Sequence, residues 1–204
     1  MSFSLRALVF VTVLTRMVGD VGSAEPQSGT LELEPSKTQI EFRLAGALHT
    51  THGTFTLERG LLSGDLATGQ AGGLIVVDAR SGDSGIGARD DRMKNAVLEV
   101  QKYPEVTFVP THIVGQLGMD NQFRASLEGI LTLHGTDHSI AMEVQGRLIG
   151  DSLVAKSHFS VPYVEWGMED PSVLFLTVAK AVDIDVATEG HVAWSGDPSR
   201  SLTK

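Results

Sequence analysis

With 204 residues, of which 42% are hydrophobic and 20% charged, the chain is long enough for one domain with a sizeable core and is not a disordered polypeptide. The formal net charge is −9 and basic residues form no cluster, so nucleic acid and anionic membrane surfaces are poor candidate partners. Cysteine is absent, which excludes disulfides and cysteine-ligated metal sites.

The first 24 residues have the features of a secretory signal peptide. Arg6 precedes an apolar run from Ala7 to Leu14, and the small residues Gly22-Ser23-Ala24 stand before Glu25. The apolar run is too short to span a membrane. We therefore expect residues 1–24 to be a signal peptide and the protein to be periplasmic or secreted.

In the first half of the remaining chain, alternating apolar and polar residues predict β-strands. The expected strands are Thr30–Leu33, Ser36–Leu44, Thr54–Leu57 and Gly73–Ala79. Between them we expect a bend over Ala45–Gly53, turns over Glu58–Gly73 and a loop over Ser81–Gly87. The chain contains 22 glycines, which we interpret as marking turns and bends of an all-β protein.

One segment breaks the β pattern and predicts a helix over Ala88–Val100. Met93 with Val97, and Ala96 with Val100, are spaced for one apolar helical face. Asp90 and Asp91 stand near the expected N-terminus, where the helix dipole favours negative charge.

The clearest strand pattern lies in a hairpin from Phe123 to Leu148. Alternate residues on both sides of Gly135 are apolar, which predicts two strands with one dry and one wet face. Further strands are expected at Glu105–Val109, Thr111–Leu117, Ser152–Val161, Ser172–Val178 and Ala181–Val192, with an irregular segment at Pro162–Pro171.

About eight amphipathic strands at regular spacing indicate either a sandwich or an up-and-down barrel over residues 25–196, followed by a polar tail at 197–204. An eight-stranded barrel is just wide enough to be filled by side chains or to hold one small ligand. The pattern leaves both alternatives open.

Residues suited to catalysis are present but do not form a recognisable set. There are seven histidines, and His134 and His138 flank the central turn, yet no spacing matches a zinc site. Asp183 and Asp185 share a wet strand face, where acids mostly serve solubility, and no nucleophile or phosphate-loop motif occurs. We therefore predict no catalytic residues, no metal and no cofactor, and interpret the two turn histidines as surface residues.

Four stretches in a particular order are informative together. They are His52–Phe55, the helix start Ala88-Arg89-Asp90-Asp91-Arg92-Met93 with the following Tyr103–Phe108, the segment Gly129–Thr136, and the strand Val182–Val186. In this order and spacing they resemble the YceI-like family of polyisoprenoid-binding periplasmic proteins, over about residues 29–194. The chain departs from many relatives at Asp137-His138, where those have a Lys-Pro-type pair.

The resemblance implies an all-β, lipocalin-like antiparallel up-and-down barrel with one helix near an end and a polyisoprenoid lipid in the lumen. The expected lipid-binding wall residues are Phe42, Phe55, Leu57, Val76, Phe108, Phe123, Leu127, Leu131, Ile140, Met142, Val144 and Phe159, with Met93 and Val97 closing one end. Arg89, Asp90 and Asp91 are expected at the rim, facing a polar headgroup, although a helix-capping role suits the two acids equally well.

The hypothesis is non-enzymatic binding, storage or transport of a long-chain polyisoprenoid in the periplasm, with a quinone among the candidate ligands. Transient membrane contact and a homodimer are further expectations. The alternative is a secreted stress-related or interaction module whose barrel core is filled by side chains.

Overall fold

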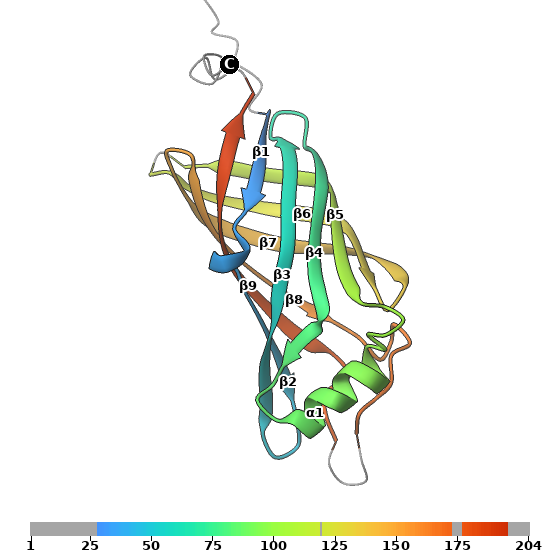
Figure 1. The fold of residues 1–204 in the computed structure, drawn as a ribbon. Helices are drawn as coiled ribbons and strands as arrows, with labels where there is room; N and C mark the ends of the chain where they lie inside the picture. Colours follow the sequence, from blue (N-terminus) through green and yellow to red (C-terminus); the bar gives the residue numbers. More distant parts are fainter. Residues whose placement is uncertain (1–27, 119, 173–176, 196–204) are drawn as a thin grey trace, which may run out of the picture.

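The computed structural model of the chain describes residues 28–118, 120–172 and 177–195, and these form a β-barrel with one helical segment at its lower end (Figure 1). The predicted signal peptide and polar tail lie outside the described residues. The strands are β1 (Ser28–Leu33), β2 (Gln39–Ala45), β3 (Thr50–Asp65), β4 (Gln70–Asp83), β5 (Glu105–Leu117), β6 (Gln122–Leu133), β7 (Thr136–Ile149), β8 (Ser152–Val161) and β9 (Val182–Trp194).

The strands form one closed antiparallel sheet. Its order is β1-β3-β2-β9-β8-β7-β6-β5-β4, and pairing of β3 with β4 closes the ring. β1 and β2 each lie between β3 and β9, one after the other along the barrel, and the 3-10 turn Pro35–Lys37 separates them. The wall is therefore eight strands around, which confirms the barrel and leaves no open sheet edge among the described strands.

The prediction of turns over Glu58–Gly73 was wrong, because β3 and β4 run through this region and only residues 66–69 form the turn. Register shifts interrupt the β3–β4 pairing between Thr54 and Thr56 and between Leu57 and Arg59. An extra residue at a bulge reverses which residues of a strand face inward. The apolar alternation is lost at that point, and the strand pattern with it.

The helical segment is shorter than expected and changes type along its length. α1 spans Gly87–Arg92, and a π-helical turn follows over Met93–Val97. α1 lies across the lower end of the barrel, beside the turn that joins β2 to β3 (Figure 1). Among the described residues, no helix is long and apolar enough to cross a membrane.

The central hairpin is present as predicted, with β6 and β7 paired in register from Gln122↔Arg147 to Leu133↔Thr136. His134 and Gly135 form its two-residue turn, with φ of 52° and 73°, values typical of a type I′ turn. This turn packs on the segment after the helix, because the Tyr103 ring lies 4.6 Å from the His134 ring and Nε2 of His134 is hydrogen-bonded to Glu99. The contact ties the helical segment to the barrel wall.

The lower part of the barrel contains a packed core. Buried residues from the helix, the wall and the segment after β8 meet there, namely Val97, Phe108, Leu131, Leu133, Val161, Tyr163 and Met168. The segment Ser172–Val178, predicted as a strand, lies partly outside the described residues.

A candidate ligand-binding cavity in the barrel

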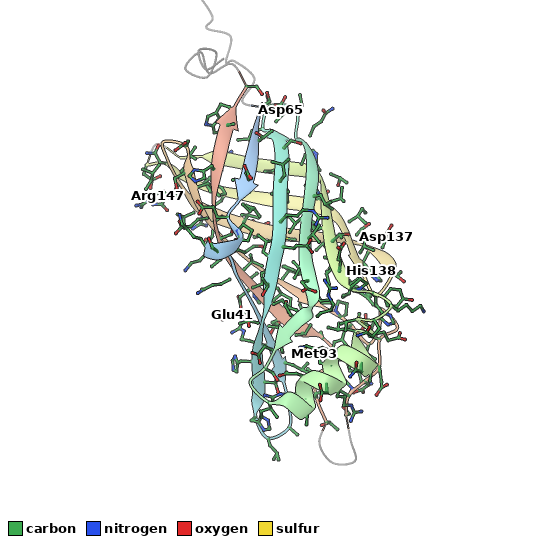
Figure 2. The ribbon with its side chains drawn as sticks, viewed as in Figure 1. Glu41, Asp65, Met93, Asp137, His138 and Arg147 are labelled. Atoms are coloured by element: carbon green, nitrogen blue, oxygen red, sulfur yellow. The ribbon has the colours of Figure 1, made fainter. Side chains whose placement is uncertain are left out.

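The barrel encloses a cavity of about 650 Å³, which we call the lumen cavity. This volume is in the range of small-molecule binding sites. Inward-facing residues of all nine strands line it, most of them Leu, Ile, Val, Phe or Ala, and Met93, Val97 and Leu98 of the helical segment form its lower end. Met93 and Asp65 mark the lower and upper ends of the barrel in Figure 2. Side chains therefore pack the lower part of the barrel but do not fill it throughout, as the alternative of a filled core would require.

Glycines on neighbouring strands make room for the phenylalanine rings of the cavity wall. Gly53 lies opposite Phe42, and Gly146 lies opposite Phe123. A Cβ atom at Gly146 would lie 2.8 Å from Cε1 of Phe123, and one at Gly53 would overlap the Phe42 ring. A Cβ atom at Gly82 would likewise lie 2.7 Å from Cε1 of Phe55, and one at Gly129 would lie 2.6 Å from Cζ of Phe108. These rings therefore lie close against the wall, which keeps the lumen open.

Twelve of the fourteen residues expected in the lipid-binding set line the lumen cavity. They are Phe42, Phe55, Leu57, Met93, Val97, Phe108, Phe123, Leu127, Leu131, Met142, Val144 and Phe159. Their role in binding a lipid stays a prediction.

Val76 and Ile140 lie outside the cavity lining. Val76 is fully buried, but it alternates with Ile75 and Val77, which do line the cavity, and so it belongs to the other face of β4. The run around Val76 is apolar on both faces, so periodicity could not identify the inner one. Ile140 shares the inward face of Met142 but packs against the lower core instead of open space.

Arg89 lines the lower end of the lumen cavity and is held by three hydrogen bonds. Its Nε donates to Oγ of Ser84 (2.8 Å), one terminal nitrogen donates to the Ser84 carbonyl oxygen (2.9 Å), and the other donates to Oγ1 of Thr51 (3.2 Å). Ser84 and Thr51 line the cavity as well. We call Thr51, Ser84, Arg89, Arg92 and Met93 the helix end of the cavity.

Asp90 and Asp91, expected beside Arg89 at the rim, do not line the cavity. Asp90 is buried and accepts hydrogen bonds from the backbone N–H (2.9 Å) and the hydroxyl of Ser84. These hydrogen bonds from Ser84 lower the pKa of the Asp90 carboxyl, so it stays ionised. Asp90 thus orients Ser84, which in turn accepts from Arg89. Asp91 is exposed.

The ionisable side chains that line the cavity are nearly all of one residue type. Besides Tyr163 they are three arginines, Arg89, Arg92 and Arg124, and the described lining contains no Asp, Glu, His or Lys. Arg92 also pairs with the exposed Glu169 (3.3 Å), so part of its side chain lies at the molecular surface. Arg124 lies in no sequence motif, and Arg92, although it stands in the helix-start stretch, was not expected to line the cavity.

Tyr163 is a buried member of the same lining, and its hydroxyl donates to the carbonyl oxygen of Ala179 (2.8 Å). Burial, with a smaller effect from the nearby Asp170 carboxylate, raises the pKa of Tyr163 to about 12. The side chain is therefore a neutral hydrogen-bond donor over the whole physiological range.

The two histidines of the central turn have different surroundings. His134 lies on the turn beside Tyr103 and Glu99, whereas His138 stacks flat on Trp166, with ring centroids 3.8 Å apart. His138 falls on the same face of β7 as the inward-facing residues. The sequence pattern did not show this, because His138 stands close to the turn. Among the described residues, no three His, Asp or Glu side chains converge in a way that could hold a metal ion.

The sequence model of the YceI-like domain matches residues 31–190 of the chain. No curated protein sequence matches the chain significantly.

Two solved structures have a similar fold. A polyisoprenoid-binding domain from Saccharophagus degradans, implicated in plant cell wall breakdown, is 17% identical with a TM-score of 0.62, over 80% of this chain and 98% of that domain. BcnA from Burkholderia cenocepacia is also 17% identical, with a TM-score of 0.61 over 77% and 98% of the two chains. At this level of identity the similarity shows the shared fold.

Proposed function

The chain belongs to the YceI-like family, and from this premise we propose that it binds a long-chain polyisoprenoid lipid in the lumen cavity without catalysing a reaction. The signal-like residues 1–24 support a periplasmic or secreted location, where such a protein would store the lipid or carry it between membranes. A prenyl quinone belongs to the same class of ligand.

The observation that carries the proposal is the apolar lumen cavity. Burying apolar surface contributes roughly 25 cal/mol per Å², so a branched hydrocarbon chain in this lumen gains affinity without many polar contacts. Among the described residues, those that line the cavity include no Asp, Glu, His or Lys, the usual acids and bases of catalysis. This composition supports ligand binding rather than catalysis.

Mass spectrometry of a solvent extract tests the proposal directly. The protein would be purified from its native host and extracted, and the same preparation would be offered prenyl alcohols of several lengths. We expect a prenyl lipid in the extract and uptake of added prenyl alcohol. Repeated recovery of empty protein that takes up none of the alcohols would contradict the proposal.

Filling the lumen provides a second test. Leu127 lines the cavity on β6, so Leu127→Trp places an indole in the open space, and we expect prenyl binding to fall at least about tenfold. Val114→Trp is the matched control, because Val114 is 61% exposed on the neighbouring strand β5. Titration of a fluorescent prenyl probe measures both variants, and equal affinities would place the ligand outside the lumen.

We also propose that the helix end of the barrel contacts the membrane from which the lipid is drawn. Leu48, in the turn between β2 and β3, is 79% exposed, and Ile86, next to α1, is 54% exposed. Leu48 stands shortly before Thr51 in the chain, and Ile86 stands between Ser84 and Arg89, so both belong to the segments that form the helix end of the cavity. A zwitterionic bilayer would cover these apolar side chains without attracting charge.

Uptake from vesicles tests this contact. Replacing Leu48 and Ile86 together with serine is expected to slow prenyl uptake from phosphatidylcholine vesicles while leaving uptake of the same lipid from detergent solution unchanged. Val114→Ser, an equally exposed site on the barrel wall, is expected to leave both rates unchanged. Wild-type uptake rates in the Leu48 and Ile86 double variant would argue against the contact. A homodimer remains a prediction.

A further inference from the structure

Among the described residues, all charged side chains that line the lumen cavity are positive. The sequence contains 25 acidic and 16 basic residues, yet the acidic residues are absent from the described lining and three arginines are present. A cavity adapted only to a hydrocarbon would need no arginine, because placing a charge next to apolar surface carries a desolvation cost. Arginine is the only charged residue type in this lining, which suggests a negatively charged group on the ligand.

The three arginines are not equivalent. Arg124 is exposed, faces the outward side of β6 opposite Gln116 and Gln145, and only reaches the edge of the cavity. Arg92 shares its charge with Glu169 on the surface. Arg89 is partly buried and forms no direct ion pair with a carboxylate among the described residues, although it interacts electrostatically with Asp90, to which Ser84 joins it.

The Arg89 guanidinium is also held in place before any ligand arrives. Ser84 and Thr51 accept three of its five N–H groups, which leaves one N–H on each terminal nitrogen without a partner among the described residues. The buried Asp90 carboxylate fixes Ser84 from the other side. A guanidinium with a free N–H on each terminal nitrogen can donate to the oxygens of a phosphate group.

We propose that the ligand is a prenyl phosphate or diphosphate whose chain fills the lumen and whose phosphate binds Arg89 at the helix end of the cavity, assisted by Arg92. This assignment rests on the proposed polyisoprenoid binding and specifies its headgroup. A quinone, which is uncharged, would leave the free N–H groups of Arg89 without an anionic partner.

The test compares three ligands with one chain and different heads, namely geranylgeranyl diphosphate, geranylgeranoic acid and geranylgeraniol. Calorimetry or competition against a fluorescent prenyl probe gives the affinity of each for the wild type, Arg89→Gln and the control variant Arg147→Gln. We expect the wild type to prefer the diphosphate. In Arg89→Gln, diphosphate binding should weaken about 10- to 100-fold, the effect of losing charge-assisted hydrogen bonds.

Binding of geranylgeraniol should be the same in wild type and Arg89→Gln, which also shows that the lumen of the variant is intact. Arg147→Gln, which replaces an exposed arginine of β7 outside the cavity lining, should bind all three ligands like wild type. The wild-type ranking of the three heads is informative even if Arg89→Gln does not fold, and Arg92→Gln then provides the second variant, with a smaller loss for the diphosphate alone.

The outcomes separate the headgroup from the proposed function. Equal affinity for diphosphate and alcohol, unchanged by Arg89→Gln, would overturn the phosphate assignment and leave prenyl binding standing. Carboxylate binding as tight as diphosphate binding would also overturn the assignment to phosphate. Failure of all three ligands to bind would overturn polyisoprenoid binding itself.

Discussion

At the scale of single residues, Tyr163 joins the lower core to the neighbouring chain segment. Its hydroxyl donates to the carbonyl oxygen of Ala179, and the backbone N–H of Ala179 donates to the carbonyl oxygen of Ala45 at the end of β2 (2.7 Å). The side chain thus connects the segment after β8, the residues before β9 and β2. A buried hydroxyl in such a position contributes both packing and a hydrogen bond.

Tyr163→Phe should lower the free energy of unfolding by about 1 kcal/mol at pH 7, the net value of one hydrogen bond plus the unpaired Ala179 carbonyl. The pH dependence of the wild-type free energy of unfolding can also be predicted, because the pKa of Tyr163 is raised from 10.0 in the unfolded chain to about 12 in the folded protein. Above the unfolded value, the unfolded chain releases a proton that the folded protein keeps, so wild-type stability falls as pH rises through this interval.

Chemical unfolding between pH 7 and pH 12 checks this prediction, with Tyr103→Phe as the control for removal of a phenol that is not in the lower core. The alkaline fall in stability should be smaller in Tyr163→Phe than in wild type. Parallel stability profiles for wild type and Tyr163→Phe would contradict the assignment of the raised pKa to burial of this hydroxyl.

Residue-level predictions from the sequence succeeded where alternation was regular. The inward parity of Phe123, Leu127 and Leu131 could be predicted because successive strand residues face opposite sides. The separate environments of Arg89 and Asp90 could not, because both depend on how the loop at Ser84 folds back, and neighbouring residues in the sequence give no sign of that.

At the scale of elements, the hairpin of β6 and β7 and the strand β8 could be predicted almost to the residue, because apolar alternation and turn chemistry agree there. The length of β3 could not, since its bulges reverse the alternation at Leu57. The change from α1 to a π-turn at Met93 also has no counterpart in the apolar spacing.

The glycines of the strands were interpreted as turns, but several of them set the width of the cavity. At Gly82 a Cβ atom would meet only side chains, Cε of Met93 and Cε1 of Phe55, both at 2.7 Å. At Gly146 it would overlap the backbone carbonyl oxygen of Val154 on β8. The first contact can be relieved by side-chain movement and the second cannot.

Gly82→Ala should therefore fold with a stability loss of about 1 kcal/mol but bind prenyl ligands more weakly, because Phe55 and Met93 move into the lumen. Gly146→Ala should lose about 3 kcal/mol or more, because two strands must separate. Thermal unfolding and prenyl-probe titration measure the two effects. Wild-type prenyl affinity in Gly82→Ala would show that this glycine does not set the width of the lumen.

At the scale of the whole molecule, the chain carries a net charge of −9 while the helix end of its cavity carries arginines. A prenyl diphosphate approaching from a distance is repelled by the molecule as a whole and attracted only near Arg89. Raising the salt from about 0.01 M to about 0.15 M shortens the screening length from roughly 30 Å to roughly 8 Å, which removes the long-range repulsion first.

Association of geranylgeranyl diphosphate should therefore become faster with added salt, the reverse of ordinary electrostatic steering toward an oppositely charged protein. Stopped-flow fluorescence measures this rate, and the uncharged geranylgeraniol should show no salt dependence. A diphosphate rate that falls as salt rises would mean that the local arginine field outweighs the net charge even at long range.

The sequence pattern could not predict that the sheet closes into a barrel. Alternation identified the strands but did not distinguish a sandwich from a barrel, because the deciding pairs, β9 with both β1 and β2, join segments that are far apart in the sequence. The resemblance to the YceI-like family, and not periodicity, predicted the barrel.

The dependence of the barrel on β9 has a consequence for the order in which the chain folds during synthesis. β9, at Val182–Trp194, pairs with β8 and with both early strands, β1 and β2, so the ring stays open until nearly all of the described sequence has left the ribosome. Contacts between such distant segments form slowly. A nascent chain of this topology remains without a closed barrel while it is being translated, and such an unfolded chain is what the export proposed above would require.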